Sequence, residues 1–208
     1  MELSKIVDCI PTDVLSFVED IQKRNYEFDV YIGGGYLRDI YTDNTPKDID
    51  IFFVPKEGEC KHAYYKPSQT YTNYHKGAIE ISDMQDRGVF ELTGLWAPRL
   101  STSDIQYIVY QKPMTQYELC ADMDMNICQI LYNIGTKETS WTEAFYKGHK
   151  GTLIECLHKY DLKRTYFRYE RMEDKFDYYD VVGKPTLEEA GIEEHEIESL
   201  RAEYEGSV

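Results

Sequence analysis

The most constraining feature of this sequence is a pair of aspartates set inside an apolar run. Asp48 and Asp50 alternate with Ile49 and Ile51, and two phenylalanines follow directly. Such alternation predicts a β-strand with both carboxylates on one face and both isoleucines on the other. Two like charges this close repel each other unless water or a cation screens them. The strand therefore has either a solvated face or a face that binds metal.

Three glycines precede this strand. Gly33, Gly34 and Gly35 are separated from Asp48 by twelve residues, 36–47. A turn without β-carbons lets backbone N–H groups approach phosphate oxygens, and a helix that begins there points its positive end at them. Carboxylates suit Mg²⁺, which completes its coordination shell with water and substrate phosphates. The two features together predict a nucleoside triphosphate (NTP) site in which Asp48 and Asp50 bind Mg²⁺. An ordinary strand-to-helix turn beside a solvated edge strand is the alternative.

Strand patterns dominate the first half of the chain and helix patterns the second, an order that favours an α+β fold. The predicted strands are 28–32, 48–54, 77–82, 89–94 and 104–110. The predicted helices are 12–25, 36–41, 115–133, 152–172 and an acidic helix that ends at Tyr204. Within 115–133 the apolar stripe continues through Ile127, Ile130 and Leu131.

Two further signals locate helix starts. Thr115 with Glu118, and Thr186 with Glu189, have the spacing of a capping box. From these patterns we expect a small mixed sheet with flanking helices, followed by a short helical C-terminal region. We place the first in a catalytic core, 1–135, and the second in 136–208.

Composition excludes several classes of protein. The nineteen tyrosines argue against disorder. No apolar run approaches the roughly 18 residues that span a membrane, and the N-terminus lacks the basic and apolar pattern of a secretory signal. We therefore expect a cytoplasmic protein without a membrane partner. The five cysteines and five histidines show no zinc-ligand spacing.

The net charge of −15 is unevenly distributed. Residues 173–208 contain 12 acidic and 3 basic side chains, whereas 146–172 contain 3 acidic and 7 basic ones. The basic segment is suited to a nucleotide or a nucleic acid, so the overall acidity does not exclude either. Alternatively, the basic helix pairs with the acidic tail. In that case the tail could cover the site, and deletion of 184–208 would test such autoinhibition.

Several of these residues resemble a known family. Gly34 to Asp39, GGYLRD, looks like the GGxVRD signature of the nucleotidyltransferases that include tRNA CCA-adding enzymes and bacterial poly(A) polymerases. Asp48-Ile49-Asp50 looks like their DxD metal motif. Residues 122–126, DMDMN, are similar to the DFTIN core of the next motif, although Cys120-Ala121 stand where the family has arginines. A second register aligns Met123-Asp124 with the FD pair of smaller relatives. The resemblance covers about residues 28–132, with a weaker similarity in the basic helix after residue 150.

The resemblance implies a polymerase β-type nucleotidyltransferase core that binds an NTP, for example ATP, with Mg²⁺ as cofactor. It implies Asp48 and Asp50 as catalytic metal ligands, with Glu91 as the first choice for a third carboxylate and Asp104 and Glu80 as further candidates. Arg38 would orient Asp39 or hold the loop closed. The implied nucleotide-binding residues are Gly33, Gly34, Gly35, Arg38, Asp39, Asp124, Asn126, Lys163, Arg164 and Arg168.

Three functions remain open. The first is nucleotidyl transfer from an NTP to the hydroxyl of an RNA end, such as that of a tRNA. The second is the same chemistry on a protein or a small molecule, as in toxin-type members of the superfamily. The third is a catalytically silent relative that binds a nucleotide or a partner protein, against which the intact Asp48 and Asp50 count. Salt dependence separates the first from the second, because RNA binding releases counterions.

Overall fold

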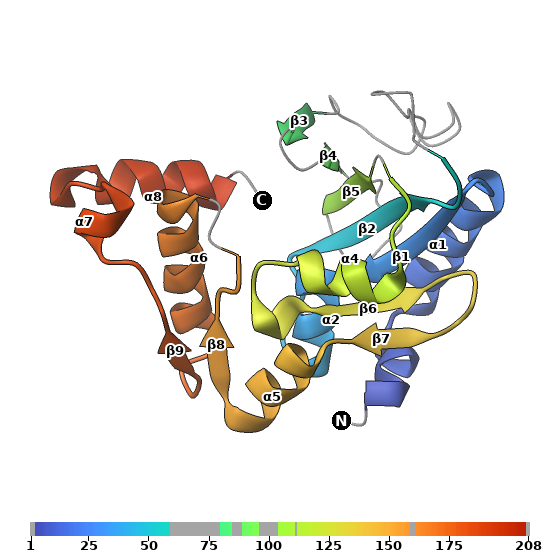
Figure 1. Cartoon of the computed structure of the whole chain (residues 1–208), viewed down its shortest axis with the longest axis horizontal. Coiled ribbons are helices and arrows are strands. Elements are labelled where there is room, and N and C mark those ends of the chain that lie inside the picture. The colour runs from blue at the N-terminus through green and yellow to red at the C-terminus, as the bar shows by residue number, and fades with distance from the viewer. Residues whose placement is uncertain are drawn as a thin grey trace. The chain divides into compact units, whose positions relative to one another are not determined.

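The computed structural model describes residues 3–58, 80–84, 89–95, 104–110, 112–158 and 161–206. The chain forms two compact units. Unit 1 comprises Met1–Ala121 and Ile130–Trp141, and unit 2 comprises Asp122–Gln129 and Thr142–Val208. The chain thus enters unit 2 briefly at 122–129, returns to unit 1, and passes into unit 2 again at Thr142. Figure 1 shows the elements in chain order.

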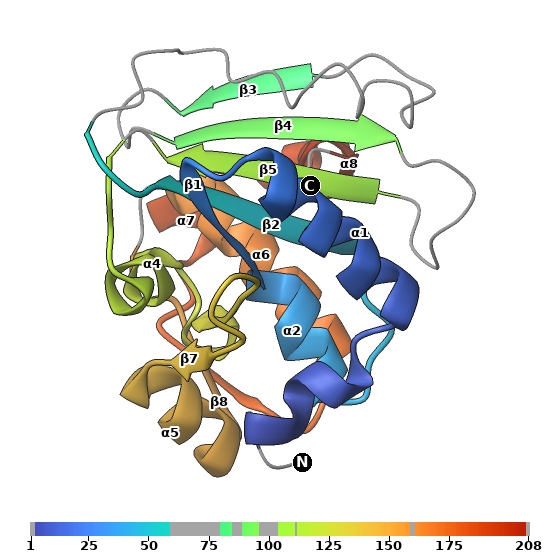
Figure 2. The same ribbon diagram turned by 90° about the vertical axis from the view of Figure 1, so that its right-hand side faces the viewer.

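Unit 1 contains a seven-stranded mixed sheet, in agreement with the predicted α+β fold. Its strands are β1 (Phe28–Gly33), β2 (Asp48–Pro55), β3 (Glu80–Met84), β4 (Val89–Leu95), β5 (Asp104–Tyr110), β6 (Ile130–Asn133) and β7 (Thr139–Trp141). They lie in the order β3-β4-β5-β2-β1-β6-β7. The β2–β5 pair is parallel (Figure 2). The other neighbouring pairs are antiparallel. Strand β2 therefore lies in the middle of the sheet, so the alternative of a solvated edge strand is wrong.

Unit 1 also contains helical segments. They are η1 (Leu3–Cys9), α1 (Thr12–Arg24), α2 (Gly34–Tyr41) and α4 (Gln116–Asp122). The apolar spacing of Leu15, Val18 and Ile21 predicts the inner face of α1; Val18 and Ile21 are buried, whereas Leu15 is only half-buried and Val14 is buried in its place. The predicted capping box at the start of α4 is present, because the N–H groups of Thr115 and Glu118 each donate to the side chain of the other residue.

The predicted helix over 115–133 is wrong in its second half. Helix α4 ends at Asp122, a short 3-10 turn follows, and Ile130 begins strand β6. Strand β6 pairs with β1, where Leu131 lies opposite Gly33. Because this strand is buried on both faces, Ile130 and Leu131 are both fully buried. Consecutive apolar residues of this kind cannot be told from one side of a helix by periodicity alone.

Unit 2 consists of helices around one short parallel ladder. Its elements are η3 (Asn126–Cys128), α5 (Glu143–Gly151), β8 (Leu153–Glu155), α6 (Leu162–Lys175), β9 (Asp180–Val182), α7 (Leu187–Ala190), η4 (Glu194–Glu196) and α8 (Ile197–Gly206). The prediction of a helix from residue 152 is wrong at its start. Leu153 to Glu155 pair with β9, and α6 begins only at Leu162, where the Asp161 carboxylate accepts the Arg164 N–H at 3.0 Å.

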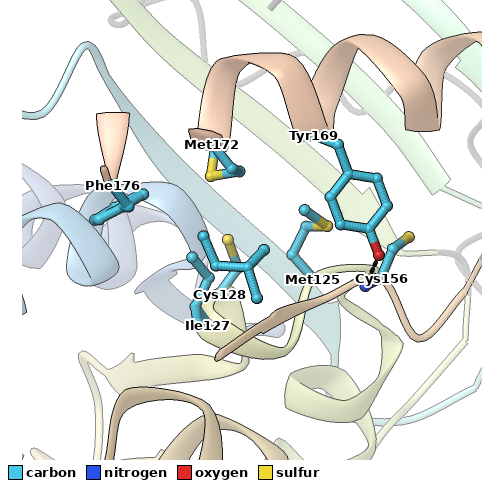
Figure 3. Packing of buried hydrophobic residues seen from close by; sticks show 8 residues of the cluster. Met125, Ile127, Cys128, Cys156, Tyr169, Met172 and Phe176 are labelled. Atoms are coloured by element: carbon cyan, nitrogen blue, oxygen red, sulfur yellow. Dashed lines mark hydrogen bonds between the residues drawn. The ribbon is translucent and has the colours of Figure 1, made fainter. Parts of the chain in front are cut away.

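Among the described residues of unit 2, apolar side chains gather in two clusters. The first contains Met125, Ile127, Cys128, Ile154, Cys156, Tyr169, Met172 and Phe176 (Figure 3). The Tyr169 hydroxyl lies at its edge, accepts the Cys156 N–H and donates to the Val182 carbonyl, each at 2.6 Å. The hydroxyl thereby joins the two segments that carry β8 and β9 to helix α6.

The second cluster fixes the acidic tail onto α6. Phe167 of α6 is buried with Ala190 and Ile192 of the tail, and its ring stacks on that of Tyr204 with centroids 5.3 Å apart. The capping box of Thr186 and Glu189 at the start of α7 is present as predicted. The tail is thus an integral part of unit 2. Deletion of 184–208, which would test autoinhibition, would also expose the buried side chain of Phe167.

Candidate functional site

The two aspartates of β2 lie as their alternation predicts. Ile49 and Ile51 are fully buried, whereas Asp48 and Asp50 are half-exposed. The buried face packs against the core of unit 1, which leaves both carboxylates on the accessible face of one central strand. Two carboxylates on one accessible strand face are suitable ligands for a cation such as Mg²⁺.

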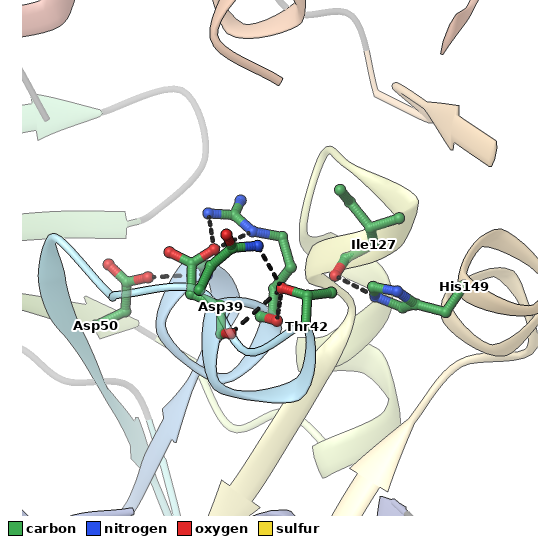
Figure 4. A network of polar contacts seen from close by, with 8 residues as sticks. Asp39, Thr42, Asp50, Ile127 and His149 are labelled. Carbon is green, nitrogen blue, oxygen red and sulfur yellow. Dashed lines mark hydrogen bonds and ion pairs between the residues drawn. The ribbon is translucent and has the colours of Figure 1, made fainter. Parts of the chain in front are cut away.

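The glycine turn lies directly beside Asp50. Strand β1 ends at Gly33, which is paired with Asp50 across the β1–β2 ladder, and α2 begins at the next residue. The Gly35 N–H donates a hydrogen bond to Asp50 Oδ2 at 3.1 Å (Figure 4). Gly34 has φ of +63°, a conformation that glycine adopts without steric cost. Sequence reasoning assigned the glycines to phosphate and did not predict their contact with Asp50.

Arg38 and Asp39 form a buried ion pair on α2. The Arg38 side chain is 7% exposed and that of Asp39 4%. Arg38 Nε and Nη2 each lie 2.8 Å from Asp39 Oδ1. The Asp39 carbonyl in turn accepts the Asn44 N–H at 2.8 Å and the Thr42 hydroxyl at 3.2 Å (Figure 4). The pair and these bonds fix the end of α2 and the turn that leads to β2. Nucleotide contacts of Arg38 and Asp39 stay predictions.

Strand register orders the candidates for a third carboxylate. In the parallel β2–β5 pair, Asp104 is the partner of Asp48. Glu91 lies on β4, one strand further from β2, and is paired with Ile108. Glu80 lies on β3, further away still. The backbone of Asp104 is therefore the nearest of the three to Asp48, while the catalytic role expected for Glu91 stays a prediction.

The remaining predicted nucleotide-binding residues belong to unit 2. Asp124 and Arg168 form an ion pair, with Oδ1 and Nη2 3.1 Å apart and both side chains about one-fifth exposed, at 21% and 18%. Arg164 lies one turn before Arg168 on α6, so these two share a face. Lys163 lies one residue earlier, about 100° around the helix from Arg164.

Asn126 links three segments of unit 2. Its side-chain oxygen accepts the N–H groups of Ile127 and Glu155, at 2.7 and 3.0 Å, and its amide nitrogen donates to the Leu153 carbonyl at 2.9 Å. A β-carbon on Gly148 would lie 2.6 Å from that nitrogen, so the absence of a side chain there lets Asn126 approach α5. Asn126 thus has a clear structural role, and its predicted nucleotide contact is untested.

The predicted site residues therefore fall into two groups. Unit 1 holds the glycines, Arg38, Asp39, the aspartate pair and Glu91, and unit 2 holds Asp124, Asn126, Lys163, Arg164 and Arg168. Among the described residues, no three His, Cys, Asp or Glu side chains form a metal cluster. Mg²⁺ typically takes only one or two protein carboxylates. Asp48 and Asp50 fit that requirement, and the bare backbone at Gly34 leaves room for the Asp50 carboxylate. In the part of the chain that the structure describes, no helix is long and apolar enough to cross a membrane.

Comparison with solved structures shows the same fold in CCA-adding enzymes. The CCA-adding enzyme of Thermotoga maritima, complexed with tRNA, is 16% identical, with a TM-score of 0.60 over 96% of this chain and 43% of that chain. A CCA-adding enzyme in complex with CTP is 15% identical, with a TM-score of 0.60 over 97% of this chain and 45% of that one. An apo tRNA-processing enzyme is 13% identical, with a TM-score of 0.55 over 84% and 45%.

These likenesses establish the fold. The chain has a nucleotidyltransferase-like fold, as the motif resemblance predicts. It spans less than half the length of each of these three solved chains. No family model and no curated protein matches the sequence.

Proposed function

We propose that this protein transfers a nucleotidyl group from an NTP to an acceptor hydroxyl, with Mg²⁺ bound by Asp48 and Asp50. The observation that carries the proposal is the position of these two carboxylates. They lie on the accessible face of β2. The Asp50 carboxylate accepts a hydrogen bond from the Gly35 N–H in the glycine turn at the start of α2. A carboxylate pair beside a glycine turn, in a nucleotidyltransferase-like fold, is suited to a metal-bound triphosphate.

In this reaction the acceptor oxygen bonds to the α-phosphorus, the bond from that phosphorus to the bridging oxygen of the β-phosphate breaks, and pyrophosphate leaves. Bound Mg²⁺ supplies charge neutralisation for the triphosphate and acidifies the attacking hydroxyl, whose proton passes to solvent. Asp48 and Asp50 would hold the cation, because their carboxylates share the accessible face of β2. The buried Arg38–Asp39 pair fixes helix α2, which begins at the glycine turn. Phosphoryl transfer depends mostly on such positioning and charge neutralisation.

For the acceptor we propose an RNA end. The solved structures with this fold are described as CCA-adding and tRNA-processing enzymes, one of them complexed with tRNA and another with CTP. Those names support an RNA acceptor and a ribonucleotide substrate here. Because the chain spans under half of their length, the acceptor is tested separately from the chemistry.

Pyrophosphate release tests the chemistry. Each of the four NTPs is incubated with the protein, Mg²⁺ and an RNA pool, for the wild type and for D48N and D50N. D29N is the matched control, because Asp29 is a half-exposed aspartate on the neighbouring strand β1, at the opposite end of the ladder from Asp50. We expect release by the wild type and D29N, and a loss of at least about 100-fold in D48N and D50N. Equal release by all four proteins would overturn the proposal.

A further inference from the structure

The contact between Asp50 and the glycine turn gives the glycines a role that their sequence did not indicate. Gly35 N–H donates to Asp50 Oδ2 at 3.1 Å, from the first turn of the eight-residue helix α2. A hydrogen bond from a backbone N–H to a carboxylate is charge-assisted, and the positive end of the helix strengthens it. The start of α2 thus already holds an anion, and that anion is a side chain of this protein.

Steric space around Asp50 depends on the same turn. A β-carbon on Gly34 would lie 2.8 Å from Asp50 Oδ2 and 3.6 Å from its carboxyl carbon. This separation is shorter than a carbon–oxygen contact allows, so a side chain at Gly34 would push the carboxylate away. A β-carbon on Gly35 would lie 3.6 Å from the same oxygen, an ordinary contact. Gly34 therefore provides the space for the carboxylate, and Gly35 provides the hydrogen bond.

We propose that Gly34 and Gly35 are positioning residues for Asp50, the metal ligand of the proposed reaction. Their backbone fixes the rotation of the carboxylate so that its orientation is set before a cation arrives. This inference rests on the proposed function, because it assigns Asp50 to a cation. It differs from the sequence prediction in which the glycines bind phosphate directly. Hydrogen bonds that orient a metal-binding side chain commonly change metal affinity by about 10-fold to 100-fold.

Substitution of Gly34 tests the inference, and Gly58 supplies the matched control. Both glycines have positive φ, +63° and +71°, so alanine pays the same backbone cost at either position. A β-carbon on Gly58 meets no atom within 4 Å, whereas one on Gly34 meets Asp50. G34N is a second variant, because asparagine tolerates this backbone conformation. G34N keeps the inference testable if G34A fails to fold.

The readout is Mn²⁺ binding without nucleotide, measured by electron paramagnetic resonance for the folded proteins. We expect the dissociation constant to rise by about 10-fold or more in G34A and G34N, and to stay at the wild-type value in G58A. G35A keeps its N–H group and has room for its methyl group, so its Mn²⁺ affinity is expected to equal that of the wild type. In the active protein, G34A should raise the Mg²⁺ concentration needed for half-maximal rate.

The outcomes separate the inference from the function. Wild-type affinity in both Gly34 variants, together with lost binding in D50N, would overturn the positioning role and leave the proposed metal site intact. Weakened binding in G58A equal to that in G34A would also overturn it, because backbone strain alone would then explain both. If the wild type binds no Mn²⁺, or D50N binds as the wild type does, the metal site itself is wrong and the inference falls with it.

Discussion

Asp39 holds the guanidinium of its neighbour Arg38 through one oxygen, which lies 2.8 Å from both Nε and Nη2 in a buried part of α2. Removal of one partner from such a pair leaves a buried charge without compensation. The GGYLRD segment thus combines a glycine turn that contacts Asp50 with an ion pair that fixes the helix behind it.

The variant D39N tests this structural role. We expect it to lower the free energy of unfolding of unit 1 by about 3–5 kcal/mol, since Arg38 stays buried and charged. D29N is the control, because Asp29 pairs only loosely with Lys56, at 3.9 Å, and both side chains are well exposed. The free energy of unfolding of D29N should fall by less than about 1 kcal/mol. Urea unfolding measures both, and equal losses in the two variants would contradict a specific role for Asp39.

Strand register makes a prediction about the third carboxylate. Asp104 is the ladder partner of Asp48, whereas Glu91 is paired with Ile108 one strand further away. On register alone, we expect D104N to reduce the rate of nucleotidyl transfer more than E91Q does, by about 10-fold or more. Steady-state rates at saturating Mg²⁺ and NTP measure this difference. A larger loss of rate in E91Q than in D104N would favour Glu91, the first choice from the sequence, as the third carboxylate.

Tyr169 gives a prediction for unit 2. Y169F keeps the ring but removes a hydroxyl that accepts the Cys156 N–H and donates to the Val182 carbonyl. Both backbone groups then lose a partner, so we expect a destabilisation of about 1–3 kcal/mol. Y178F is the control, because Tyr178 is 59% exposed. Chemical denaturation measures the change in both variants, and Y169F as stable as Y178F would contradict the bridging role.

The attachment of the tail to α6 predicts a pH dependence. Glu170 of α6 accepts hydrogen bonds from Lys184 and from Arg201, the latter at 3.1 Å. Burial opposes ionisation, but these two cations hold the pKa of Glu170 below its usual range. A carboxyl group whose pKa is depressed by folding stabilises the folded state above its unfolded pKa, near 4.3, and loses that contribution as the pH falls through the folded value.

We therefore expect E170Q to lower the free energy of unfolding by about 1 kcal/mol at neutral pH. The difference from the wild type should shrink progressively below about pH 4.3. E188Q is the control, because Glu188 is an exposed acid of the tail. Urea unfolding between neutral and acidic pH measures the effect. A difference that stays constant, or grows, as the pH falls would show that Glu170 does not act through its charge.

The sequence predicts what local patterns determine. Strands β1 and β2 were predictable because each has buried positions next to clear turn signals, and Asp48 and Asp50 alternate with buried isoleucines. The capping boxes at Thr115 and Thr186 were predictable because a box is contained within four residues.

Pairing between strands that are distant in sequence determines the elements that local patterns did not predict. Ile130 and Leu131 follow a helical pattern, but β1 offers them an edge and they form a strand. Leu153 to Glu155 extend for the same reason, because β9 pairs with them. The bond from Gly35 to Asp50 and the pairing of Asp104 with Asp48 depend on sheet register. Strand register is not determined by any single segment of sequence. The Gly35–Asp50 hydrogen bond and the Asp104–Asp48 pairing could therefore be found only in the structure.

Transfer of label from an α-³²P-labelled NTP into total RNA and total protein, with Mg²⁺, tests the central claim most directly. The D48A/D50A double variant is assayed in parallel, and its fold is checked by circular dichroism. We predict label in the RNA pool with the wild type and none with the double variant. Label in the protein pool alone would keep the chemistry and move the acceptor to protein. No label in either pool, or equal labelling by the folded double variant, would contradict metal-dependent nucleotidyl transfer to a macromolecule at Asp48 and Asp50.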